Sequence, residues 1–115
     1  MTDGARLIVY PVTDVAKAKE FYGTLLGVEP YADQPYYVGY RVDGQEIGLD
    51  PNGHRQGLTG ALPYWYVADI RASLDALLGA GAQELQAVRD VGGGRLVALV
   101  KDADGNTIGL VQAEA

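Results

Sequence analysis

Two segments of the chain carry apolar residues at the three- and four-residue spacing of an amphipathic helix. The apolar positions of the first segment are Val15, Ala18, Phe21, Tyr22, Leu25 and Leu26, and Gly27 follows them. Those of the second segment are Ile70, Leu74, Leu77 and Leu78, with Gly79 and Gly81 after them. Asp14 and Asp69 precede the two segments and supply side-chain oxygens that cap helix N-termini. The pattern therefore predicts two helices, each with one face packed on a core.

The remaining apolar runs are short and typical of strands. One run (6–12) precedes the first helix, and another (62–67) precedes the second. Further strands are predicted at 36–42, 45–50, 83–91, 95–101 and 106–111. Asp43-Gly44 separates two of these runs and is a strong hairpin signal, whereas residues 28–34 show no decisive pattern. Each half of the chain is therefore predicted to have the order β-α-β-β-β.

A seven-residue phrase, DGxxIGL, occurs at 43–49 and again at 104–110. Upstream, YPVTDV at 10–15 is echoed by WYVADI at 65–70, and the second copy is six residues longer between these landmarks. Loops absorb such a difference readily. We therefore expect one domain over 1–115 with two copies of one unit, at about 5–50 and 61–112. The glycine-rich segment 51–60 is predicted to link them.

Composition narrows the classes of partner. The 115 residues carry a formal charge of −6, which disfavours nucleic acid and anionic membranes and favours neutral or cationic ligands. The absence of cysteine excludes disulfides and thiol chemistry. No apolar run approaches the roughly 20 residues of a membrane span, and no signal peptide is evident. We expect a cytoplasmic protein.

The βαβββ repeat, the phrase FYGTLLG at 21–27 and the phrase DADGN at 102–106 together resemble the vicinal oxygen chelate superfamily. This is the group of glyoxalases, bleomycin-resistance proteins and extradiol dioxygenases. The resemblance implies an α+β fold in which two tandem βαβββ modules form a curved mixed sheet around a cavity, with helices on the outer face. It also implies a homodimer.

In enzymes of that family, about four side chains hold a divalent metal, from each module's first and last strands. Carried over to this chain, those positions are Leu7, Gly48, Leu62 and Gly109. Neither leucine nor glycine has a side-chain donor atom. A one-residue shift of the first-strand alignment reaches only Arg6, Ile8, Ala61 or Pro63. We therefore expect no metal and no cofactor.

Strand alternation assigns the remaining residues to the two faces of the sheet. A two-residue turn at Asp43-Gly44 places Arg41 opposite Glu46, Gly39 opposite Gly48 and Tyr37 opposite Asp50. The next residues, Tyr40, Ile47, Val38 and Leu49, then face the helix. The Gly48 face lines the cavity by the family resemblance. The predicted ligand-binding residues are Tyr37, Arg41, Glu46, Asp50, Tyr64, Tyr66 and Thr107.

Several of these positions have a structural alternative, and any one tyrosine suits the core or the cleft wall better than the role of an acid catalyst. Arg41 and Glu46 together also suit a surface ion pair, and glycines in strands also mark bulges or close backbone contacts. We favour lost metal ligands for Gly48 and Gly109, with space opened above both. Trp65 falls on the helix side and is predicted to lie in the core. His54 is either a general base or an exposed loop residue.

The leading hypothesis is a metal-independent small-molecule-binding protein that resembles the bleomycin-resistance branch. It would sequester a bulky aromatic or cationic compound in a tyrosine-rich cleft. The alternative is an enzyme: a metal-independent lyase, isomerase or hydrolase that uses Glu46 or Asp50 as base and a tyrosine as acid, or a lyase of the glyoxalase kind despite the missing ligands. A third possibility is a regulatory or partner-binding module, for which a filled cavity would be the sign.

Overall fold

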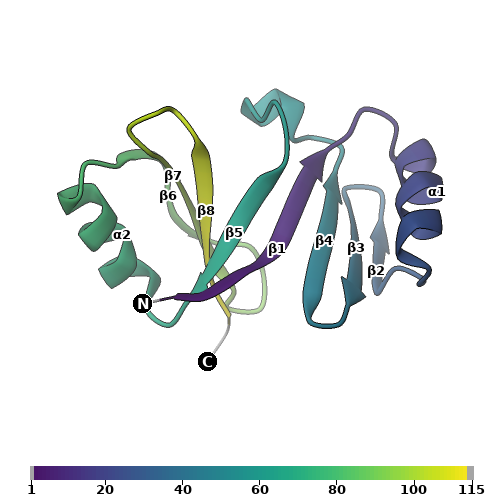
Figure 1. Ribbon diagram of the computed structural model, residues 1–115, viewed down its shortest axis with the longest axis horizontal. Helices are drawn as coiled ribbons and strands as arrows, with labels where there is room; N and C mark the ends of the chain where they lie inside the picture. The colour runs from purple at the N-terminus through teal and green to yellow at the C-terminus, as the bar shows by residue number, and fades with distance from the viewer. Residues whose placement is uncertain (1, 114–115) are drawn as a thin grey trace. The chain divides into compact units, whose positions relative to one another are not determined.

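The computed structural model describes residues 2–113, which form two compact units. The first unit is residues 6–62, and the second comprises residues 63–113 together with the N-terminal residues 2–5. Each unit has a four-stranded mixed sheet with one long helix against one of its faces (Figure 1). The predicted α+β class and the βαβββ modules are confirmed.

The first unit contains β1 (Thr2–Pro11, from residue 6 on), α1 (Val15–Leu26), β2 (Ala32–Gln34), β3 (Tyr37–Val42) and β4 (Gln45–Asp50). Its strand order is β2-β3-β4-β1, with β1 parallel to β4 and the other pairs antiparallel. Strand β2 lies in the stretch that the sequence left undecided. A short 3-10 turn, η1 (His54–Gln56), follows β4 within the predicted linker.

Local chemistry fixes both ends of α1 and the hairpin after β3. A carboxylate oxygen of Asp14 accepts a hydrogen bond from the Lys17 backbone N–H at 3.1 Å, and Gly27 ends the helix at φ 70°. The hairpin turn has positive φ at both Asp43 (47°) and Gly44 (83°), which is the geometry that an Asp-Gly turn favours. The predicted caps and turn are therefore confirmed.

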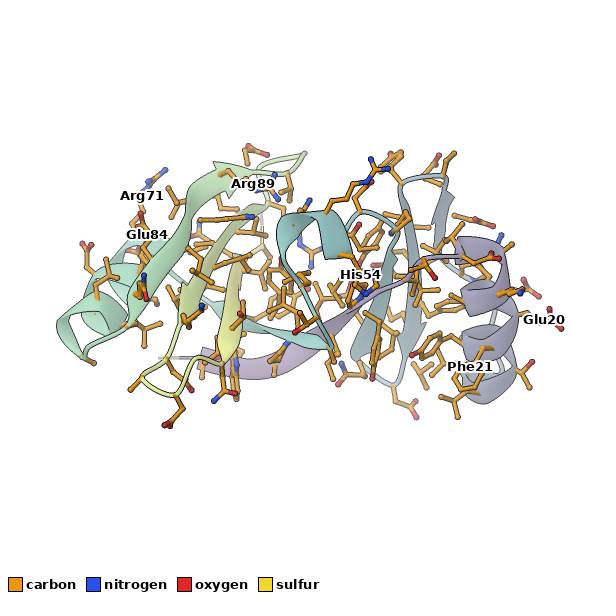
Figure 2. All side chains as sticks on the ribbon, turned by 90° about the horizontal axis from the view of Figure 1, so that it is seen from above. Glu20, Phe21, His54, Arg71, Glu84 and Arg89 are labelled. Atoms are coloured by element: carbon orange, nitrogen blue, oxygen red, sulfur yellow. The ribbon has the colours of Figure 1, made fainter. Side chains whose placement is uncertain are left out.

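The core of the first unit lies between α1 and the sheet. Its buried residues are Val38, Tyr40, Ile47 and Leu49, packed against Val15, Ala18, Tyr22 and Leu26 among others. Two members of the predicted helix stripe are not part of it, because the side chains of Phe21 and Leu25 are 64% and 68% exposed. At about 100° per residue they lie past the edge of the packed face. Figure 2 shows Glu20 on the side of α1 that points away from the strands.

The second unit contains β5 (Leu62–Val67), α2 (Ile70–Gly79), β6 (Gln83–Asp90), β7 (Leu96–Lys101) and β8 (Thr107–Gln112). Its order is β5-β8-β7-β6, with β5 parallel to β8 and the other pairs antiparallel. The second repeat has a longer β6 (8 residues where β2 has 3) and longer turns on both sides of β7, which together outweigh its shorter helix.

The core of the second unit lies under α2. It consists of Val67, Ile70, Leu74, Ala98, Val100 and Leu110. The Asp69 carboxylate caps α2 by accepting the Ala72 N–H at 3.1 Å. The prediction that Trp65 belongs to a core is wrong: its Cα partner Leu110 is buried, but the indole is 36% exposed at the border of the packed region. Within residues 2–113, neither helix has the length and apolar character needed to cross a membrane.

Candidate functional site

The face of the first sheet that points away from α1 carries the predicted polar residues. Gly39 pairs with Gly48, and Arg41 pairs with Glu46, as the hairpin register predicts. Side chains that pair across strands share a face, and the neighbouring residues Tyr40 and Ile47 point into the α1 core. The pairing ends at Val38 and Leu49, one step before the expected Tyr37–Asp50 pair.

Two tyrosine rings lie over the paired glycines. A Cβ atom on Gly48 would be 2.7 Å from the ring carbon Cζ of Tyr37, and a Cβ on Gly39 would be 2.8 Å from Cζ of Tyr31. Both distances are shorter than a van der Waals carbon–carbon contact, so a side chain at either position would require the tyrosine ring to move. The expectation that Gly48 opens space is therefore wrong, because the Tyr37 ring fills it.

A polar cluster lies beside these rings. The Tyr31 hydroxyl donates a hydrogen bond of 2.8 Å to Oε1 of Glu46. The guanidinium carbon of Arg41 lies 4.2 Å from the centroid of the Tyr31 ring, and its Nη2 lies 3.8 Å from the same Glu46 oxygen. The Arg41 side chain is 59% exposed and that of Glu46 only 13%. The carboxylate is therefore sheltered, whereas the guanidinium lies at the solvent boundary.

Asp50, another predicted binding residue, stabilises a turn. Its Oδ1 accepts a hydrogen bond of 2.8 Å from the Asn52 backbone N–H, and this bond shapes the turn after β4. The residues of the first unit that remain candidates for ligand contact are therefore Tyr31, Tyr37, Arg41 and Glu46. The Asp50 carboxylate stabilises a turn.

The second unit repeats the tyrosine-on-glycine contact at the equivalent glycine. Tyr64 is the Cα partner of Gly109, and a Cβ on that glycine would be 2.6 Å from Cε1 and 2.8 Å from Cγ of the ring. Here too the ring fills the space expected above the glycine. In both units, a tyrosine ring thus covers the glycine that the resemblance aligns with the family's last-strand ligand.

Tyr66 lies two residues further along β5, beside Val111 of β8. Its hydroxyl accepts a hydrogen bond of 2.7 Å from Nη2 of Arg95, whose guanidinium carbon is 5.7 Å from the ring centroid. Thr107, the last predicted binding residue, is half-buried at the start of β8 and pairs with Lys101.

Sequence reasoning missed Tyr31 and Arg95. Tyr31 stands just before β2, in a segment without periodicity, and its backbone N–H bonds to the Gly39 carbonyl at 2.9 Å. The available signal was Gly39, because a glycine inside a strand marks a close approach. Arg95 directly follows the triple-glycine turn 92–94, and nothing in its spacing points to Tyr66.

The side chains present do not fit a divalent metal. Leu7 and Leu62 are buried apolar residues, 6% and 2% exposed. Gly48 and Gly109 offer no donor, and tyrosine rings occupy the space beside them. Within residues 2–113, no three His, Cys, Asp or Glu side chains come together in a group that could hold a metal ion. His54 lies in η1, exposed to solvent (Figure 2).

An open pocket of about 490 Å³ lies elsewhere on the first unit, at the C-terminal end of α1. It is lined by Lys19, Glu20, Gly23, Thr24, Gly27, Val28, Glu29, Pro30 and Tyr40. Burial raises the pKa of the Tyr40 hydroxyl, which donates to the Lys19 carbonyl at 3.2 Å. This pocket borders the helix side of the sheet, opposite the tyrosine-bearing face.

Comparison with known proteins places the fold. Residues 5–110 match the family model described as Glyoxalase/Bleomycin resistance protein/Dioxygenase superfamily. A search of curated proteins gave no significant match.

Solved structures with the same fold include two methylmalonyl-CoA epimerases. The enzyme from Mycobacterium tuberculosis has 18% identity and a TM-score of 0.74, over 99% of this chain and 90% of that one. The enzyme from Streptomyces coelicolor has 16% identity and a TM-score of 0.76, over the whole of both chains. A superfamily member from Vibrio splendidus 12B01 has 19% identity and a TM-score of 0.70, over 92% and 95%. At these identities the likeness concerns the fold alone.

Proposed function

Because this chain belongs to the glyoxalase/bleomycin resistance protein/dioxygenase superfamily, we propose that it is a metal-independent small-molecule-binding protein with a role like that of the bleomycin-resistance proteins. Its ligand is a bulky aromatic or cationic compound, held against the tyrosine-bearing face of a unit's sheet. The observation that carries the proposal is the placement of Tyr37 over Gly48 and Tyr64 over Gly109. These rings lie beside the two glycines that the family resemblance aligns with metal-ligand positions.

The chemistry of these faces suits such a guest. Tyrosine rings offer large flat contact areas, favour offset stacking with other rings, and attract cations to their faces. The charge of −6 favours the approach of cations over anions. The Asp50 carboxylate accepts a hydrogen bond within a turn, and the Glu46 carboxylate accepts one from Tyr31. Ring stacking is therefore the main source of ligand affinity in this proposal.

Calorimetric titration against a panel of aromatic natural products, with and without ammonium groups, tests the proposal in the presence of EDTA. We expect saturable binding that Tyr37→Ala weakens by about 2- to 10-fold, from the usual worth of one aromatic contact. Tyr36→Ala is the matched control, since this neighbouring tyrosine is 66% exposed and lies just before β3. Absence of binding across the panel, or equal losses in both variants, would contradict the proposal.

A second candidate, an enzyme with a carboxylate base, rests on one contact. The sheltered Glu46 carboxylate and the Tyr31 hydroxyl are 2.8 Å apart, an arrangement that general acid–base catalysis uses. Two of the structural neighbours are epimerases, which is an analogy of fold. Deuterium incorporation from D₂O into an acyl-CoA thioester, lost in Glu46→Gln, would favour this candidate over binding alone.

A further inference from the structure

Tyr31 and Glu46 together have the two components of a site for an organic cation. The ring face attracts positive charge, and the carboxylate supplies the counter-charge. The 2.8 Å hydrogen bond between them fixes the ring and the carboxylate relative to each other. Glu46 is 13% exposed, so its charge is sheltered from water on most sides and acts more strongly at short range.

The chain's own Arg41 occupies this position. Its guanidinium carbon is 4.2 Å from the Tyr31 ring centroid, within the range of a cation–π contact. The distance of 3.8 Å from its Nη2 to Glu46 Oε1 is longer than a hydrogen bond. With 59% of the side chain exposed, Arg41 is held by two weak contacts, and exposed ion pairs of this kind contribute little.

We propose that Tyr31 and Glu46 form a cation subsite, which Arg41 fills in the unliganded protein and leaves when a ligand brings its own ammonium or guanidinium group. The inference rests on the proposed binding function and names the ligand class for this face: an aromatic compound with an attached organic cation. Arg41 then acts as an internal competitor, which lowers the affinity for weakly cationic guests and is displaced only by a better-fitting cation.

The test compares benzyltrimethylammonium with neutral benzyl alcohol by NMR titration. In the variant Arg41→Gln, we expect the cation to bind about 3- to 10-fold more tightly than in the wild type, as the loss of one exposed competing contact predicts. Benzyl alcohol should bind both proteins equally. Arg41→Lys, which keeps a competing cation, should remain within about 2-fold of the wild type. Glu46→Gln should remove the preference for the cation over the alcohol.

Arg89→Gln is the control for net charge. Arg89 is exposed on β6 in the second unit (Figure 2), and its loss changes the total charge as much as the loss of Arg41 does. We expect no change in affinity for either probe. If Arg41→Gln leaves cation binding unchanged or weaker, or if Arg89→Gln tightens it equally, the subsite is overturned, while continued binding of benzyl alcohol still supports the proposed function. If neither probe binds any variant, both proposals fail.

Discussion

At the scale of single residues, the glycines on the tyrosine-bearing faces differ in how the ring reaches them. Tyr37 approaches Gly48 with its hydroxyl end, the part of a tyrosine that moves most easily. Tyr64 approaches Gly109 with Cδ1, Cε1 and Cγ, atoms close to its own backbone. The first ring therefore has a route away from its glycine, whereas the second is held in place by its strand.

This difference predicts unequal effects of adding one methyl group. We expect Gly109→Ala to lower the free energy of unfolding by about 1–3 kcal/mol, because the Tyr64 ring atoms nearest its backbone cannot move away without strain. Gly48→Ala should cost under about 1 kcal/mol, since Tyr37 swings outward. Urea denaturation measures both. Gly23→Ala is the control, because a Cβ there would be 3.7 Å from the Tyr40 hydroxyl and the helix gains propensity. Equal costs at Gly48 and Gly109 would contradict the argument.

Sequence patterns identified the glycines and the register but gave the wrong consequence for the space above them. Alternation fixes which residues share a face, so the pairs Arg41–Glu46 and Gly39–Gly48 were predictable. Alternation does not tell whether a long side chain stands upright or lies over its neighbour. Tyr31 could not be predicted either, because it lies in an irregular segment beside Gly39. No periodicity exists there from which to place it.

At the scale of elements, the helices and turns follow from local chemistry, and the errors occur at their borders. The helix caps at Asp14 and Asp69 and the Asp-Gly turn could be predicted from the sequence because each depends on one or two residues. The exposure of Phe21 and Trp65 could not be predicted from the sequence, because it depends on how far a helix extends over its sheet. Both apolar side chains lie at the edges of packed faces, where spacing alone is ambiguous.

The turn before β8 gives a prediction about pH. Hydrogen bonds from the Asn106 side chain and backbone, at 3.0 and 2.9 Å, lower the pKa of the Asp102 carboxyl below its usual value. A carboxyl whose pKa is lowered by folding stabilises the protein above its unfolded-state pKa, and this stability is lost as the pH falls through the lowered, folded-state pKa. Asn106→Ala should therefore raise the pKa of Asp102, measurable by NMR titration.

The accompanying loss of stability should be present at neutral pH and should disappear in acid, once Asp102 is protonated in both proteins. Asp102→Asn is the control background, in which Asn106→Ala should lose its dependence on pH. A pKa of Asp102 that does not move in Asn106→Ala would show that backbone donors, including the Asp104 N–H at 3.0 Å, account for the effect.

At the scale of the whole molecule, the repeat DGxxIGL predicted two units, and each unit indeed has a helix against one face of a mixed four-stranded sheet. The repeat carried the architecture because in both copies it includes the last strand, which pairs antiparallel with the strand before it and parallel with the first strand of the unit. The turns differ, with two residues (43–44) in the first unit and five (102–106) in the second. The chemistry differs between copies: Tyr31, Arg41 and Glu46 cluster in the first unit, and Tyr66 with Arg95 lies in the second. The homodimer remains a prediction.

The absence of donor side chains at the four aligned metal-ligand positions predicts how metal ions affect the stability of the entire chain. A ligand at 100 times its dissociation constant stabilises the native state by about 2.7 kcal/mol, which raises the thermal midpoint of a chain this size by roughly 5 °C or more. Because Leu7, Leu62, Gly48 and Gly109 provide no donor, Zn²⁺, Ni²⁺ or Mn²⁺ should leave the midpoint within about 1 °C of its value in EDTA. An aromatic cation that binds should raise it in the same scan, which shows that the assay responds. A rise with one metal that EDTA reverses would mean that donors other than these four positions assemble a site, and the metal-independent function would then be wrong.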